Sequence, residues 1–174
     1  MSWQTESVAA WQESVLDLAD MKGSDLLSGV IHKMQLVPAI DESGTFSAAV
    51  HHGALVASDD FVQPALMTAI DGDLTVAGMV TTEGVEGGDG NATLVVFGDL
   101  HCRSLVNDWA SIVIVTGDCI VEDWVFAARE DSAFIVGGAF RTPIFVGADI
   151  WVSVGGVVEI ETGDGYAVAL RHAG

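Results

Sequence analysis

Residues 94–121 read LVVFGDLHCRSLVNDWASIVIVTGDCIV and contain two apolar runs that each end in a Gly-Asp pair. Val96 precedes Gly98 by two residues, and 19 residues later Val115 precedes Gly117 in the same way. This spacing extends in both directions, with intervals of 20, 20, 19, 21 and 18 residues between successive valines. The valines are Val56, Val76, Val96, Val115, Val136 and Val154. A fixed period with strand-like alternation inside each unit predicts a solenoid.

Each expected coil bends at a small residue two positions after its valine. These residues are Ser58, Gly78, Gly98, Gly117, Gly138 and Gly156. Side chains two apart on a strand share a face, so the apolar positions on both sides of the bend should point inward and stack between coils. All six valines are therefore expected in one buried column. Trp124 and Phe145 occupy a further inward position, seven residues after the bend.

The sequence predicts an all-β fold, a right-handed parallel β-helix that forms a solenoid of about six coils, with an N-terminal helical element. A leucine-rich repeat would need an asparagine ladder and a leucine triplet, which are absent. A left-handed hexapeptide helix would hold the period fixed, whereas the period here varies. Tandem hairpins in a β-sandwich are the remaining alternative, because short apolar strands with glycine turns also build sandwiches.

Residues 1–36 are expected to form a helical cap or cover, and residues 37–174 the β-helix, as a single structural unit overall. The first helix should begin at a cap, Ser2 or Thr5, and a second helical segment should span residues 24–36. A turn is expected at residues 41–44 and a strand at residues 46–50. One face of the first helix is apolar and carries Val8, Trp11, Val15, Leu18 and Ala19.

The units LVVFGDL at residues 94–100 and IVTGDC at residues 114–119 resemble coils of polymer-forming, bactofilin-like β-helix proteins. The resemblance covers about residues 54–160. It implies end-to-end assembly into filaments, and it implies no catalytic residues. The chain departs from that pattern in its helical first 36 residues, which would block polymer growth if they cap one end.

The formal net charge is −19, from 25 acidic and 6 basic residues, while half of the residues are hydrophobic. Such a field repels phosphate backbones, which argues against a nucleic-acid partner. It favours a basic partner, or it simply keeps an apolar protein soluble. No signal peptide and no membrane span are predicted, and two cysteines suit a reducing compartment, so we expect the chain in the cytoplasm.

Two features of the sequence are candidate cation sites. Asp99 and Asp118 fill equivalent positions on neighbouring coils, but aspartate after glycine is ordinary turn chemistry, and we expect that role. Residues 87–92 are similar to a calcium-binding nonapeptide, yet Ala92 stands where that motif needs a carboxylate. A small polar cluster, whose spacing matches no defined metal site, contains His51, His52, Asp59 and Asp60. No metal site, cofactor or catalytic residue is predicted.

The two cysteines should remain free thiols. Cys102 and Cys119 are expected two positions and one rung apart, a separation of roughly 8 Å that exceeds the reach of a disulfide. Cys102 should point inward and His101 outward, which argues against a catalytic pair. Arg103 is expected to form an exposed ion pair with Glu122 on the next coil.

A second apolar stripe lies on the expected outer face. Its candidate residues for an interaction surface are Val95, Phe97, Ile114 and Ile135. Parallel sheets are usually covered on both faces, and exposed apolar stripes mark contacts. The stripe should be covered either by the first helix or by a second subunit.

These observations favour a non-catalytic protein-interaction or self-assembly β-solenoid. The expected partner is another protein or a second copy of the chain, so a homo-oligomer is possible, with no nucleic acid and no membrane. One alternative is an acidic inhibitor or immunity-type protein that neutralises a basic partner. Another is a carbohydrate-active enzyme on a β-helix scaffold, for which Trp109, Trp124 and Trp151 would supply aromatic side chains.

Overall fold

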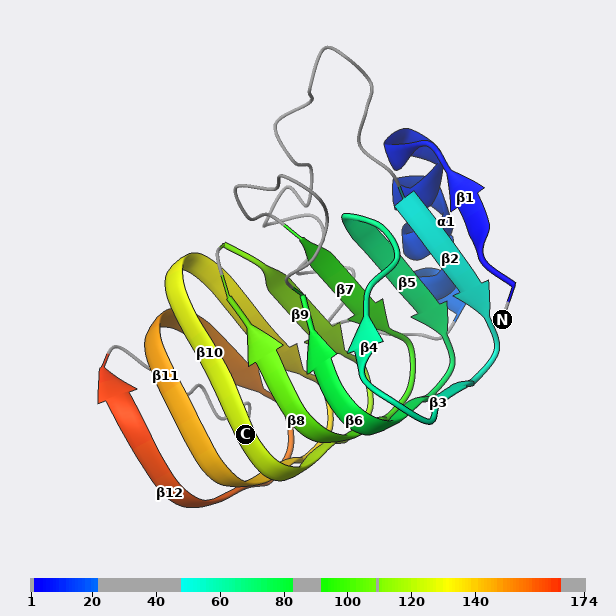
Figure 1. The fold of residues 1–174 in the computed structure, drawn as a ribbon. Helices are drawn as coiled ribbons and strands as arrows, with labels where there is room; N and C mark the ends of the chain where they lie inside the picture. The colour runs from blue at the N-terminus through cyan, green and yellow to red at the C-terminus, as the bar shows by residue number, and fades with distance from the viewer. Residues whose placement is uncertain (1, 22–47, 83–91, 109, 167–174) are drawn as a thin grey trace.

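The computed structural model describes residues 2–21, 48–82, 92–108 and 110–166. Within these ranges, one helix and twelve strands form a β-solenoid of about five turns (Figure 1). The elements are β1 (Gln4–Glu6), α1 (Val8–Met21), β2 (Ala48–His52), β3 (Leu55–Ala57), β4 (Phe61–Val62), β5 (Met67–Asp71), β6 (Leu74–Thr81), β7 (Thr93–Val96), β8 (Leu100–Asn107), β9 (Ile112–Val115), β10 (Cys119–Val136), β11 (Phe140–Val154) and β12 (Val158–Tyr166). Every pairing is parallel except that of β1 with β2, which confirms the predicted parallel β-helix.

Each coil contains three strand stretches. The first stretch is formed by β2, β5, β7, β9 and the last parts of β10 and β11. A corner at a glycine, followed by aspartate in three of the coils, leads to the second stretch, formed by β3 and the first residues of β6, β8, β10, β11 and β12. The third stretch follows as β4 and the later residues of β6, β8, β10, β11 and β12, and it lies nearest the viewer in Figure 1.

Four of the six repeat valines stack in one internal column, as predicted. Val96 pairs with Val115, Val115 with Val136, and Val136 with Val154, and all four are buried. The parallel ladder carries these side chains from coil to coil, so they form a continuous apolar core.

The prediction is wrong for the first two coils. Val96 stacks on Ile70, which lies 26 residues earlier, and not on Val76. Val76 is buried in a different column, beside Ala57 and Cys102, and Val56 lies on the outside with 71% of its surface exposed. The coil that includes residues 83–91 is longer than the others. Apolar and polar residues alternate regularly in the strands on both sides of it, so the sequence pattern does not reveal the shift in register.

The corner glycines are also displaced in the early coils. Gly72, Gly98, Gly117 and Gly138 stack at the first corner, where the Gly117 N–H donates to the Gly98 carbonyl at 2.9 Å. A Cβ on Gly117 would lie 2.8 Å from that same oxygen, so this corner excludes a side chain. Ser58 and Gly78, which were expected in this column, belong instead to the bend between the second and third stretches.

Helix α1 begins later than both predicted caps, Ser2 and Thr5. Residues 4–6 pair with β2 as an antiparallel strand, and Ser7 starts the helix, with its Oγ accepting the Ala10 N–H at 3.2 Å. An N-cap oxygen satisfies one of the amides that a helix start leaves unpaired. The predicted helix at residues 24–36 and the turn at residues 41–44 fall outside the described ranges. The expected strand at residues 46–50 corresponds to β2 at Ala48–His52.

The apolar face of α1 packs against the outside of the first stretch, near β2 and β5 (Figure 1). Trp11, Val15, Leu18 and Ala19 are buried in a cluster separate from the solenoid interior. Burying an apolar helix face in this way provides most of the stability of such a helix. In the part of the chain that the structure describes, no helix is long and apolar enough to cross a membrane.

Candidate interaction surface

The apolar stripe predicted from sequence lies within the protein. Val95, Phe97, Ile114 and Ile135 are buried, and they share one hydrophobic cluster with the apolar face of α1. The alternative in which the helix covers the stripe therefore matches the structure. These four side chains already have a cover from their own chain, so an apolar surface open to a partner has to lie elsewhere on the solenoid.

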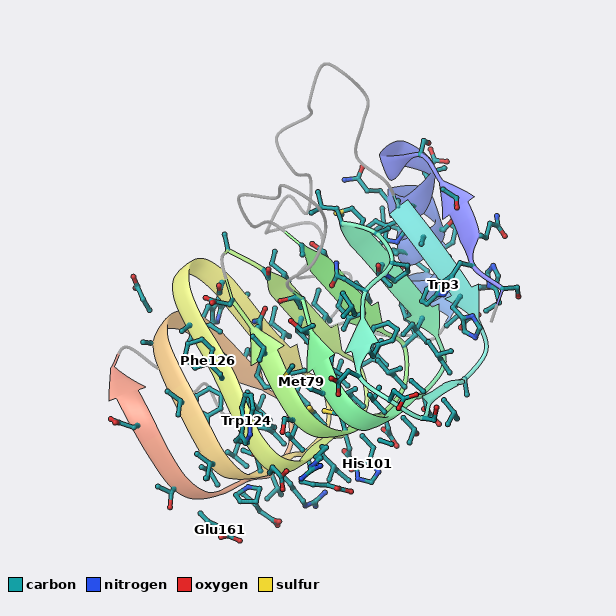
Figure 2. The ribbon with its side chains drawn as sticks, viewed as in Figure 1. Trp3, Met79, His101, Trp124, Phe126 and Glu161 are labelled. Carbon is teal, nitrogen blue, oxygen red and sulfur yellow. The ribbon has the colours of Figure 1, made fainter. Side chains whose placement is uncertain are left out.

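The outside of the third stretch carries such a surface. Two outward rows flank the inward row of Val80, Leu105, Val125 and Phe145. We call the outward apolar side chains on β6, β8, β10 and β11 the front patch, and its members are Met79, Val106, Trp124, Phe126, Ile144 and Val146. Figure 2 shows Met79, Trp124 and Phe126 on the strands nearest the viewer.

The front patch is continuous because like positions align across rungs. Met79, Trp124 and Ile144 lie in one row, interrupted only by the small Ser104 on β8. Ile144 has 44% of its surface exposed, and the other five members are half-buried. Neighbouring strands lie about 4.8 Å apart, so outward side chains on adjacent rungs are close neighbours and together form an apolar area on the outside of the sheet.

Trp124 was expected inside the core, and that prediction is wrong. The register shifts between Val121 and Trp124, because β10 has two residues, Glu122 and Asp123, where β8 has only Arg103. One extra residue turns every following side chain to the opposite face. The bulge therefore buries Val125 and places Trp124 outside. A repeat pattern alone does not reveal the bulge, although the neighbouring pair Glu122 and Asp123 is a polar insertion at an expected strand position.

The same bulge changes the predicted ion pair. Arg103 Nε donates to Asp123 Oδ2 at 2.8 Å, and Glu122 instead lies 3.0 Å from His101 Nε2. The hydrogen bond and charge of Asp123 raise the pKa of Arg103 above its ordinary value. The expectation that Arg103 pairs with an acid one rung away is right, but the expected partner, Glu122, is wrong.

Carboxylates lie along one edge of the front patch, at the bend between the second and third stretches. These are Asp60, Glu122, Asp123 and Glu161, all exposed. Asp60 is held beside Met79, because its Oδ1 accepts the Met79 N–H at 2.8 Å. Arg103 is the one basic residue at this edge within the described ranges, and Asp123 already pairs with it. The front patch is therefore apolar at its centre and acidic along one side.

The stacked aspartates at the other corner have a structural role. Asp73 Oδ1 accepts the Asp99 N–H at 2.9 Å, Asp99 accepts from Asp118 at 2.8 Å, and Asp118 accepts from Ala139 at 2.8 Å. Asp73 occupies the position before Asp99, so three carboxylates align. Each satisfies a corner amide that turns away from the ladder. Among the described residues, no three metal-binding side chains lie close enough to hold a metal ion.

Both cysteines are buried free thiols, as predicted. Burial raises the pKa of Cys102 to about 12, with a smaller contribution from Glu122, and it raises the pKa of Cys119 well above its ordinary value. Thiols of this kind are inert, because the thiolate is the reactive form. His101 points outward and pairs with Glu122, so it does not face Cys102.

The other polar and aromatic residues singled out in the sequence are separated or lie outside the described residues. The His51 ring lies 5.3 Å from the Trp3 ring, while His52 Nδ1 lies 3.7 Å from Asp71 Oδ2. Trp109 and residues 87–91 are not among the described residues. Trp151 is 49% exposed on the first stretch, well separated along the coil from Trp124 on the third.

The front patch offers side chains suited to binding: two aromatic rings, four aliphatic or thioether groups and an acidic edge. Aromatic residues and methionine are enriched at protein interfaces, and aromatic side chains supply much of the binding energy there. No family model, no curated protein and no solved structure matches this chain.

Proposed function

We propose that this chain is a non-catalytic protein-interaction module that binds a basic protein partner through the front patch. The observation that carries the proposal is the outward placement of Trp124, Phe126 and Ile144 on neighbouring rungs of a rigid sheet. Contiguous apolar surface of this kind is unusual on a protein that binds nothing.

The partner's chemistry follows from the edge of the patch. Four exposed carboxylates border the apolar centre, and the whole chain carries a formal charge of −19. A partner with apolar residues surrounded by lysine and arginine would match both features. Long-range attraction would also accelerate its association.

The acidic inhibitor or immunity-type function is the more specific form of this proposal. In that form the basic partner is an enzyme, and the front patch or its acidic edge would lie against the active site. The charge of the chain supports it equally well. Loss of the partner's activity on binding would separate an inhibitor from a simple scaffold.

The carbohydrate-active alternative and the cytoplasmic location remain predictions. Trp124 and Phe126 could stack on sugar rings, with Asp123 beside them, so a binding assay on immobilised polysaccharides addresses that alternative on the same surface. Two buried cysteines without a disulfide are consistent with the cytoplasm.

A displayed library of random peptides provides defined probes for the test. We expect peptides selected on the wild-type protein to combine aromatic or aliphatic residues with lysine and arginine. Trp124→Glu should weaken their binding by about tenfold or more, because an anchor at the centre of the patch is lost. The matched control, Val56→Glu, places the same charge on another exposed apolar position.

Binding should also weaken as sodium chloride is raised, because exposed charges are screened. The proposal fails if selected peptides bind Trp124→Glu and Val56→Glu equally well. It also fails if selection yields acidic or neutral peptides whose affinity does not depend on salt.

A further inference from the structure

At the C-terminal end of the solenoid, the last described strand has an unpaired edge. β12 pairs with β11 on one side, and in the described residues no strand pairs with its other side. Val158 and Ile160 are inward residues of β12, yet they are only half-buried. Phe140 and Cys119, which occupy the same column as Val158 on earlier rungs, are fully buried. The core is therefore incompletely covered at this end.

The N-terminal end is different. The Trp3 ring lies 6.4 Å from the Phe61 ring, and Leu55 and Phe61 at this end of the core are buried. β1 also pairs antiparallel with the outer edge of β2. Figure 1 shows β1 and α1 at one end of the solenoid and β12 at the other. Among the described residues β3 and β4 pair only with β6, but Trp3 packs against the core there and β1 covers β2, so head-to-tail stacking of two copies would have to displace these segments.

The outward side chains of β12 are acidic. Glu159, Glu161 and Asp164 are exposed, and Glu161 has no ion-pair partner among the described residues. A second copy placed tail to tail would bring these carboxylates against their own counterparts. Like charges on paired strands are unfavourable.

Neighbouring rungs of this solenoid repeatedly set a cation beside an acid. Arg141 Nε lies 3.0 Å from Glu159 Oε2, and Arg103 Nε lies 2.8 Å from Asp123 Oδ2. Both pairs connect outward residues that are one rung apart. A strand added beyond β12 would continue this arrangement if it carried cations opposite the outward carboxylates of β12.

We propose that the open edge of β12 is a strand-addition site for an extended segment of a partner protein in which apolar residues alternate with lysine or arginine. The segment's backbone would pair with the free edge of β12. Its apolar side chains would cover Val158 and Ile160, and its cations would lie beside Glu159 and Glu161. This site is separate from the front patch and does not depend on it.

A short synthetic peptide of alternating valine and lysine, carrying a fluorophore, is the probe. We expect it to bind the full chain and to slow hydrogen exchange at backbone amides of residues 158–161. An alternating serine–lysine peptide has the same charge without apolar side chains, and an alternating valine–glutamate peptide has the opposite charge. Both should bind at least about tenfold more weakly, because each lacks one half of the complementarity.

Two charge variants locate the site. Glu161→Lys should weaken binding of the valine–lysine peptide by about tenfold. Asp17→Lys makes the same change in net charge on an exposed position of α1, far from β12, and should leave most of the affinity intact. Trp124→Glu should not weaken binding, which separates this site from the front patch.

Three results would overturn the proposal. If the serine–lysine peptide binds as tightly as the valine–lysine peptide, binding depends on net charge alone. Equal loss of affinity in Glu161→Lys and Asp17→Lys would place the peptide elsewhere. Sedimentation showing that the free chain is already a dimer or filament, with β12 amides protected without peptide, would identify a second copy as the occupant.

Discussion

At the Gly-Asp corner, successive coils can stack closely because the corner glycines have no Cβ. A side chain on Gly117 would overlap the backbone of Gly98 and the carboxylate of Asp99. We expect Gly117→Ala to lower the free energy of unfolding by about 1–3 kcal/mol, which is the usual cost of overpacking. Gly163 is the matched control, because the atom nearest to an added Cβ there is the Phe145 carbonyl oxygen at 3.7 Å, and the backbone is not left-handed.

Gly163→Ala should be neutral or should stabilise the protein by about 0.4–1 kcal/mol, by restricting the unfolded chain. Urea unfolding of the two variants measures the difference. If both alanines have the same effect, close coil contact at the corner does not determine stability.

Val115 and Val56 hold equivalent positions in the sequence repeat, but the structure separates them. Val115 is buried in the core, whereas Val56 is largely exposed. Val115→Asp should prevent folding, because an unpaired buried charge costs more than a domain's net stability allows. Val56→Asp should change the free energy of unfolding by no more than about 0.5 kcal/mol. Circular dichroism of the two purified variants is sufficient, and a folded Val115→Asp protein would contradict the observed register.

Because the two thiols are buried, we expect the free energy of unfolding to fall at alkaline pH. The pKa of Cys102 is about 12 in the folded state, while an unfolded thiol titrates near ~8.5. Above that lower value the unfolded state loses a proton that the folded state keeps, so the free energy of unfolding falls by up to about 1.4 kcal/mol per pH unit. The contribution of the Cys102 thiol to the free energy of unfolding is fully present below about pH 8.5 and disappears as the pH rises toward 12.

Urea unfolding at pH 8 and pH 10.5 checks this expectation. Cys102→Ala should be less stable at pH 8, because it leaves a cavity, but should lose less stability between the two pH values. Native protein should also resist a thiol reagent until it unfolds. Equal alkaline losses in the wild type and the variant would assign the effect to other groups.

At the scale of elements, α1 serves as the cover of the first stretch. Its buried Trp11 and Val15 share a cluster with Val95 and Ile114. Deleting residues 1–21 should expose this apolar surface, so the truncated protein should bind a hydrophobic dye and aggregate. A truncated protein that stays monomeric, binds no dye and melts at the wild-type temperature would show that the helix covers nothing essential.

The sequence predicts elements well where the repeat is regular. From Leu94 onward, strand positions and inward valines follow the alternation, and the helix face at Trp11 and Val15 follows the helical period. Before that point the prediction fails, because the longer coil shifts Val76 out of the column of Val96. Length variation between coils leaves no mark on a local pattern, since each strand alternates correctly in either register.

The candidate site was harder to predict than the fold. The front patch depends on one extra residue at Glu122 and Asp123, which moves Trp124 from inside to outside. The predicted stripe at Ile114 and Ile135 was correctly recognised as needing a cover. Deciding between a helix and a partner required the packing of α1, because sequence periodicity does not specify which apolar faces meet.

At the scale of the whole molecule, charge opposes folding. The formal charge of −19 arises from 25 acids and 6 bases, so carboxylates far outnumber the cations that could form ion pairs such as Arg103 with Asp123. Self-repulsion destabilises the compact state, and salt screens it. The screening length falls from ~30 Å at 0.01 M to ~10 Å at 0.1 M salt. We therefore expect the melting temperature at pH 7 to rise as sodium chloride is raised toward ~0.5 M.

The control repeats the salt series near the isoelectric point, where the sequence pI is about 4.1. There the net charge is close to zero, so screening has no net repulsion to remove, and the rise should disappear. Surface ion pairs act in the opposite direction, because salt weakens them. A melting temperature that falls with salt at pH 7 would mean that pairs across the rungs outweigh the repulsion. The acidic surface would then be organised as a stabilising network, and the attraction of a basic partner would have to overcome it.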